Sequence, residues 1–164
     1  MAEEKKEKLR TRRAGRECAM KYLFERLVNG SYNEITYDVL ANTVENDGIN
    51  YFERLVSDVS EKFNFLKDVV SSFILKYDSN RIYKIDLAIL MIATNEILFY
   101  EDLPNKVAIN EAIEISKIYS TDNSPSFING ILGSILEDAD NLRGKYESIV
   151  DWWKKNFCWK KSWN

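Results

Sequence analysis

Residues 83–99, YKIDLAILMIATNEILF, are apolar on nearly every side of a helix. A helix of this kind belongs at the centre of a bundle, where other helices cover all of its faces. The flanking sequence supplies such helices, because apolar residues recur at helical spacing on both sides of the stretch. The chain has two prolines and six glycines, and no long Val/Thr alternation indicates strands. We therefore predict an all-α fold.

The same periodicity predicts six further helices, at about residues 12–29, 35–44, 52–63, 66–77, 104–119 and 124–136. Pro104 and Pro125 suit the first turn of the helices that they open. A length of 164 residues fits one compact bundle of about seven helices. We divide the chain into a flexible charged N-terminal arm (1–11), the helical domain (12–142) and a C-terminal extension (143–164), in which Gly144 interrupts the pattern and a helical tail follows.

Composition excludes several classes of protein. The chain has no His, and its only cysteines are Cys18 and Cys158, which excludes a disulfide framework, the common zinc patterns and histidine catalysis. No glycine-rich phosphate loop is present. No apolar run is long enough to span a membrane, and the N-terminus lacks the apolar middle of a signal peptide. We expect a cytoplasmic protein that is not an enzyme and needs no cofactor or metal.

Charge is unevenly distributed along the chain, although the formal net charge is only −3. Residues 1–16 carry seven Lys and Arg against three Glu, whereas residues 34–61 carry seven carboxylates against one Arg. Lys and Arg neutralise phosphates, which is the main nonspecific source of affinity for nucleic acids. The basic segment, which continues to Lys21 and Phe24, therefore favours RNA binding. A solvated charged terminus is the alternative interpretation of such a run, and composition leaves both open.

The C-terminal segment combines tryptophan with lysine. All four tryptophans lie among the last 13 residues, WWKKNFCWKKSWN. Such a segment packs on the bundle with its lysines in water, stacks on RNA bases, or lies on an anionic membrane surface. The residues alone favour packing, followed by RNA, and leave the three alternatives open.

Four blocks of the sequence resemble the NusB family of transcription antitermination factors. They are RRAGRECAMKYLFE (12–25), YFERLV (51–56), KVAINEAIEISKI (106–118) and YSTDNSPSFINGIL (119–132). The resemblance implies a seven-helix RNA-binding protein without catalytic activity. It further implies that the protein binds boxA-type single-stranded RNA together with a small-subunit ribosomal protein, NusE. Through RNA polymerase and other Nus factors, this complex suppresses termination, chiefly in rRNA operons, and family members occur as monomers or homodimers.

The resemblance also assigns residues to sites. With Lys21 from the basic segment, the expected RNA-binding residues are Arg12, Arg13, Arg16, Lys21, Phe24, Asn123, Ser124 and Phe127, and Glu96 is expected to bind the protein partner. The N-terminus of the helix that begins near Ser124 would offer backbone N–H groups to a phosphate. Gly15 stands where the family has Ala, a change that weakens a helix by about 1 kcal/mol. Glu111, in the KVAINEAIE block, is expected to face water or a partner.

Two alternatives remain at this stage. One is the NusB-like RNA-binding domain of an RNA methyltransferase, without its catalytic part. The other is a helical membrane-surface or interaction protein that acts through its Trp/Lys tail.

Overall fold

The computed structural model describes residues 2–76 and 82–157. In these residues the fold is all-α, as predicted, and contains eight helices and no strand. They are α1 (Ala2–Asn29), α2 (Glu34–Ala41), α3 (Asp47–Glu61), α4 (Phe63–Lys76), α5 (Lys84–Phe99), α6 (Asn105–Tyr119), α7 (Ser124–Glu137) and α8 (Ala139–Phe157). None of these helices is long and apolar enough to cross a membrane.

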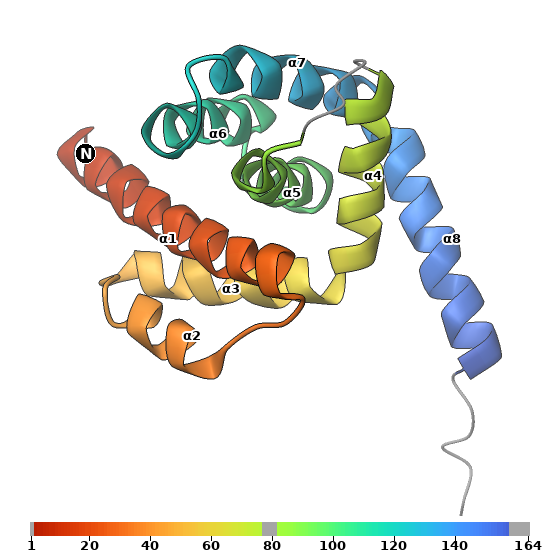
Figure 1. The fold of residues 1–164 in the computed structure, drawn as a ribbon, viewed down its shortest axis with the longest axis horizontal. Helices are drawn as coiled ribbons and strands as arrows, with labels where there is room; N and C mark the ends of the chain where they lie inside the picture. The colour runs from red at the N-terminus through yellow and green to blue at the C-terminus, as the bar shows by residue number, and fades with distance from the viewer. Residues whose placement is uncertain (1, 77–81, 158–164) are drawn as a thin grey trace, which may run out of the picture.

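Helix α5 occupies the centre of the bundle, as its sequence predicts. Every residue from Asp86 to Leu98 is buried. Figure 1 shows α5 between α1 and α3 on one side and α6 and α7 on the other, with α4 beside it. The polar residues of α5 are therefore held inside the protein, where burial without a partner is costly. Asp86 and Glu96 have partners on other segments, whereas among the described residues the side chains of Thr94 and Asn95 have no hydrogen-bond partner.

Two glycines allow α1 and α3 to cross closely. A Cβ added at Gly15 would lie 2.6 Å from the carbonyl oxygen of Gly48, and one added at Gly48 would lie 2.5 Å from that of Thr11. Any side chain at either position would push the helices apart. Gly15, which propensity alone marks as a weakness in α1, is therefore required by the packing of α1 on α3.

Several helix boundaries differ from the sequence-based expectation: α3 begins at Asp47 rather than near residue 52, and the largest differences concern α1 and α8. Helix α1 begins at Ala2 rather than near residue 12, so the segment expected as a flexible arm is helical from residue 2 onward. The segment consists mostly of residues with high helix propensity, and Glu3 and Glu4 in the first turn stabilise the helix through its dipole. Helix α8 continues through Gly144, which we expected to interrupt it. One glycine costs a helix only about 1 kcal/mol, and the turns on either side outweigh it.

Arg143 fixes the first half of α8 to the end of α5. Its Nε donates to the carbonyl oxygen of Leu98 at 2.7 Å, and its Nη2 donates to that of Ile97 at 3.0 Å. These bonds satisfy carbonyl groups that the last turn of α5 leaves without helical partners. The start of α8 is thereby part of the bundle, and its direction is set by α5.

Candidate nucleic-acid interface

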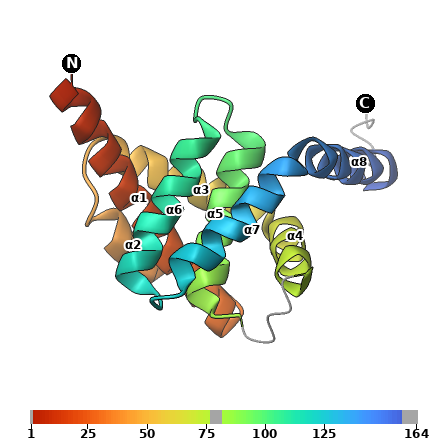
Figure 2. The same ribbon diagram turned by 90° about the horizontal axis from the view of Figure 1, so that it is seen from above.

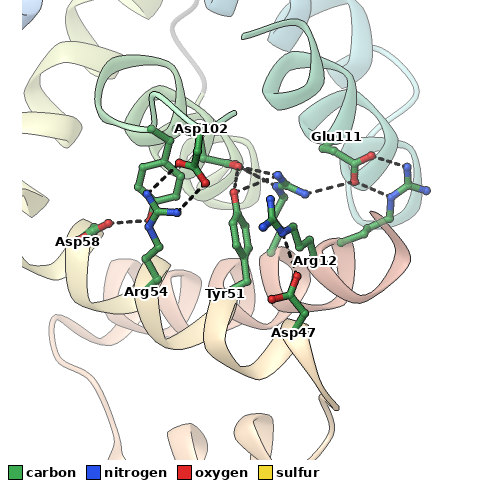
Figure 3. A network of polar contacts seen from close by, with 11 residues as sticks. Arg12, Asp47, Tyr51, Arg54, Asp58, Asp102 and Glu111 are labelled. Atoms are coloured by element: carbon green, nitrogen blue, oxygen red, sulfur yellow. Dashed lines mark hydrogen bonds and ion pairs between the residues drawn. The ribbon is translucent and has the colours of Figure 1, made fainter. Parts of the chain in front are cut away.

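A buried ion pair joins α1 to α5 (Figure 3). Arg16 and Glu96 are each only 1% exposed. The Arg16 guanidinium donates to the Glu96 carboxylate through Nε at 2.9 and 3.1 Å and through Nη2 at 2.8 Å. Tyr51 on α3 donates its hydroxyl to the same carboxylate and accepts from Arg16 Nη2 at 3.1 Å. This arrangement ties three helices together through one carboxylate.

Electrostatics keep both Arg16 and Tyr51 protonated. Burial alone would lower the pKa of Arg16, but the charge and hydrogen bonds of Glu96 outweigh it and raise that pKa. Burial raises the pKa of Tyr51, and the neighbouring Glu96 carboxylate raises it further. Arg16 Nη1 lies 3.8 Å from Glu111 and has no hydrogen-bond partner within the described part of the chain.

Arg12 and Arg13 lie at the edge of this network and are partly exposed. Arg13 forms two parallel hydrogen bonds of 2.7 Å with the Glu111 carboxylate on α6, which raise its pKa. Arg12 donates to Asp47 at 3.2 Å and lies over the ring of Tyr51. The expectation that Glu111 faces water or a partner is wrong, because its side chain is buried against α1 and neutralises Arg13 of the same chain.

The network continues along α3 to the end of α5, as Figure 3 shows. Arg54 donates to both carboxylate oxygens of Asp102, at 3.1 and 3.2 Å, and these hydrogen bonds lower the pKa of Asp102. The Arg54 guanidinium also covers the ring of Tyr100, whose hydroxyl donates to Asp58 at 2.7 Å. The Arg54–Asp102 pair is more exposed than the Arg16–Glu96 pair, so the network of polar contacts reaches the surface here.

A second set of contacts forms the α1–α6 edge, by which we mean Arg13, Glu17 and Lys21 of α1 with Glu111 and Tyr119 of α6. Tyr119 donates its hydroxyl to Glu17 at 3.0 Å, and the Lys21 ammonium lies over the Tyr119 ring. The three α1 residues repeat every four positions and therefore share one side of the helix. This edge presents charge and an aromatic ring to solvent.

Phe24 and Phe127 are both half-buried and pack against the core. Phe24 lies on α1, one turn beyond Lys21, and Phe127 lies in the first turn of α7. Asn123, which precedes α7, is exposed. These three residues combine partial exposure with aromatic or amide groups, which suits stacking on bases and hydrogen bonding to them.

The start of α7 is organised around a buried carboxylate. Ser124 donates to Asp86 at 2.9 Å, and Ser120 donates to the other oxygen of that carboxylate at 2.5 Å. The Ser124 hydroxyl also accepts from the Thr121 backbone N–H at 3.3 Å. Ser124 is therefore occupied inside the protein, and the Asp86 charge beside the helix N-terminus would oppose a phosphate there.

The structure divides the expected site residues into two groups. Arg16, Glu96 and Ser124 are buried and bonded within the protein, so they position other groups rather than face a ligand. The partly or fully exposed group comprises Arg12, Arg13, Lys21, Phe24, Asn123 and Phe127. The sequence did not single out Tyr51, Tyr119 or Asp86, because their roles depend on partners that are distant along the chain.

The C-terminal tryptophans do not pack on the bundle where the structure describes them. Trp152, Trp153 and Phe157 are 53–59% exposed, contrary to the packing interpretation that the sequence favoured. The other two tryptophans, Trp159 and Trp163, lie outside the described residues. Within the described ranges, no cluster of three His, Cys, Asp or Glu side chains could hold a metal ion.

Comparisons with known proteins all lead to one family. A model of the NusB family matches residues 13–137. The transcription antitermination protein NusB of Clostridium novyi is 44% identical over 130 residues, which cover 77% of this chain and 98% of that protein. The protein of the same name from Finegoldia magna is 36% identical over 133 residues, covering 80% and 97%.

Solved structures give the same result for the fold. NusB of T. maritima superposes with a TM-score of 0.69 at 33% identity, covering 77% of this chain and 91% of its own. A chain from a crystal structure of the antitermination factors NusB and NusE with double-stranded RNA superposes with a TM-score of 0.68, covering 78% and 97%. Its identity of 18% means that this second likeness supports the fold alone.

Proposed function

Since this chain belongs to the NusB family, we propose that it is a transcription antitermination factor that binds boxA-type single-stranded RNA together with a NusE-type ribosomal protein. In this role it joins nascent RNA, in the cytoplasm, to RNA polymerase and other Nus factors, chiefly on rRNA operons. It acts by binding and performs no catalysis.

The observation that carries the RNA part of the proposal is the α1–α6 edge. Arg13 and Lys21 lie on one side of α1, and Tyr119, the last residue of α6, contacts Glu17 and Lys21 there. Cationic groups bordered by half-buried aromatic rings are what a single-stranded RNA needs, because phosphates pair with the cations and bases stack on the rings. We assign phosphate contact to Arg12, Arg13 and Lys21.

Base contact is assigned to Phe24, one turn beyond Lys21 on α1, and to Asn123 and Phe127, which lie just before α7 and in its first turn. Arg16 and Glu96 hold α1 in register against α5 and do not touch the RNA. Glu96 therefore influences a protein partner only through the position of α1. A basic ribosomal protein would instead be attracted by the acidic residues 34–61 of α2 and α3, since complementary charge accelerates encounter.

The test measures binding of a labelled boxA-like RNA and a scrambled RNA, at fixed physiological salt, with and without the ribosomal protein. The variant Arg13→Ala/Lys21→Ala removes two positive charges from the edge. We expect weaker binding and a salt dependence whose slope falls by about one to two, one for Lys21 and up to one for Arg13, whose charge Glu111 partly neutralises. The ribosomal protein should strengthen binding of the boxA-like RNA to the wild type.

The matched control is Lys67→Ala/Lys76→Ala, which removes the same charge from α4, away from the edge. It should bind RNA as the wild type does. Equal losses in both double variants would show that net charge alone is responsible, and the assignment to the edge would be abandoned. Indifference of the wild type to RNA sequence and to the ribosomal protein would contradict the antitermination role itself.

A further inference from the structure

The second half of α8 leaves the bundle with an uncovered apolar side. Leu142 is buried, and Tyr146 packs on Phe65 and Phe99 with ring centroids 5.0 Å away in each case. Trp153 and Phe157 follow at helical spacing on the same side of α8, yet both are more than half exposed. We call Ile149, Trp152, Trp153 and Phe157 the overhang. Figure 1 shows this part of α8 extending beyond the other helices.

The proposed RNA function does not account for the overhang. The family model ends at residue 137, before α8 begins. In Figures 1 and 2, α8 also lies at the opposite end of the molecule from the start of α1. The rings of Trp153 and Phe157 already lie 4.3 Å apart at 35°, so each has one face covered by the other. The two rings therefore form one apolar surface, and they do not offer two free ring faces on which bases could stack.

A groove lies beside the overhang, between α4 and α8. It has a volume of about 850 Å³, and its lining combines Phe65, Asp68 and Val69 of α4 with Leu142, Lys145 and Ile149 of α8. Ile149, the first residue of the overhang, therefore lies at the end of the groove. Its α4 wall spans residues 64–72, and the overhang spans residues 149–157. Nine helical residues are about 13 Å long at 1.5 Å per residue, so the overhang and the groove match in length.

Charge also distinguishes the two parts of the molecule. The last 13 residues carry four Lys and no acidic residue, whereas residues 1–151 carry 19 Lys and Arg against 26 Asp and Glu. The tail of one molecule is therefore attracted to the body of another. The apolar side of the overhang faces the same way as Tyr146, toward the bundle. A flat membrane reaches a side that faces the bundle less easily than a helix does.

We propose that the overhang docks into the α4–α8 groove of a second copy of this chain, so that two molecules exchange tails about a two-fold axis. Aromatic side chains bury about 150–250 Å² each when covered, so the half-exposed overhang offers roughly 400 Å². In a two-fold exchange each copy buries its overhang and the lining of its groove, which exposes less than half the area of the overhang. The total is about 1,200 Å², at the lower end of the range for specific, stable interfaces.

Intrinsic fluorescence of the full chain tests this directly, because every tryptophan lies in residues 152–163 and the emission reports the tail alone. Sedimentation equilibrium gives the mass over the same concentrations. We expect a dimer whose tryptophan emission shifts to longer wavelength on dilution, in step with dissociation. A chain that stays monomeric up to about 100 µM would overturn the proposal.

Two variants test the two sides of the contact. Trp153→Ala/Phe157→Ala should raise the dissociation constant by at least about 30-fold, the effect of losing an interface hot spot. Gly144→Arg fills the groove, and an added Cβ there meets no atom within 4 Å, so the fold is retained. It should weaken the dimer as well. The control Ile35→Ala/Val39→Ala removes exposed apolar side chains from α2 and should leave the dimer unchanged.

The remaining outcomes would also overturn the proposal. Dimerisation that is lost in the tail variant but kept in Gly144→Arg would place the overhang on another surface. A shift to shorter wavelength when the monomer meets phosphatidylglycerol vesicles, with no dimer at any concentration, would make a lipid surface the occupant. The proposal does not depend on RNA binding, so it stands or fails separately from the proposed function.

Discussion

Removing the charge of Glu96 tests whether Arg16 depends on one buried counter-ion. The variant Glu96→Gln keeps the shape of the side chain but leaves the Arg16 guanidinium, whose side chain is 2% exposed, without its main partner. Breaking a buried pair in this way costs about 3–5 kcal/mol, because a charge remains in a site of low polarity. Glu111, 3.8 Å from Arg16 Nη1, supplies part of the missing charge. We therefore expect a loss of about 3 kcal/mol.

The double variant Arg16→Met/Glu96→Met should lose less stability than Glu96→Gln alone. It replaces both charges with apolar side chains, so no buried charge is left without a partner. The free energies of unfolding come from urea titrations followed by far-UV circular dichroism and linear extrapolation. Tryptophan fluorescence does not serve here, since it reports only the C-terminal tail.

The control for the Arg16 and Glu96 variants is Arg54→Met, which breaks the exposed ion pair with Asp102. It should lower the free energy of unfolding by no more than about 1 kcal/mol. If Glu96→Gln also costs less than about 1 kcal/mol, Glu96 is not the counter-ion on which Arg16 depends. The single variants Arg16→Met and Glu96→Met complete the cycle, and effects that add up to that of the double variant would refute the reasoning as well, because coupled partners must deviate from additivity.

Three other perturbations follow from the same structure. Gly48→Ala forces α1 away from α3 and should cost about 1–3 kcal/mol in urea unfolding; a neutral result would mean that the crossing has room to relax. The pKa values of Tyr51 and Tyr100 are raised, chiefly by burial. The folded state therefore keeps the full contribution of each neutral tyrosine to its stability below about pH 10. Above that pH the free energy of unfolding falls, by up to about 1.4 kcal/mol per pH unit for each tyrosine. Urea midpoints from pH 8 to 11 should show this fall, with a shallower slope in Tyr51→Phe; equal slopes would contradict it. Glu111→Gln releases Arg13 and should tighten RNA binding, measured by fluorescence anisotropy, whereas weaker binding by folded protein would show that Glu111 holds Arg13 in its binding position.

The sequence predicts the helical framework well because local patterns determine it. The all-round apolar character of residues 83–99 can only be satisfied in the middle of a bundle, and α5 lies there. Gly144 shows the limit of such signals. A single glycine lowers helix propensity by a fixed small amount, whereas α8 is also held by the hydrogen bonds from Arg143 to the end of α5.

The site was harder to predict because its residues depend on partners far along the chain. Helical periodicity places Glu111 on one side of α6, but it does not show that Arg13, 98 residues earlier, lies opposite. Arg16 looks like a surface cation for the same reason, since its partner Glu96 is 80 residues away. Gly15 has a low helix propensity whatever surrounds it, and only the α1–α3 crossing shows why a glycine is needed there.

The sequence separation of these ion pairs has a consequence during synthesis of the protein. Arg13 leaves the ribosome 98 residues before Glu111, the carboxylate that neutralises it in the folded chain. At about 5–20 residues per second, the interval is on the order of 5 to 20 s. Until Glu96 emerges, 80 residues after Arg16, neither Arg13 nor Arg16 has its acidic partner from α5 or α6. The nascent N-terminal segment is therefore a more strongly cationic ligand for nearby RNA than the finished protein.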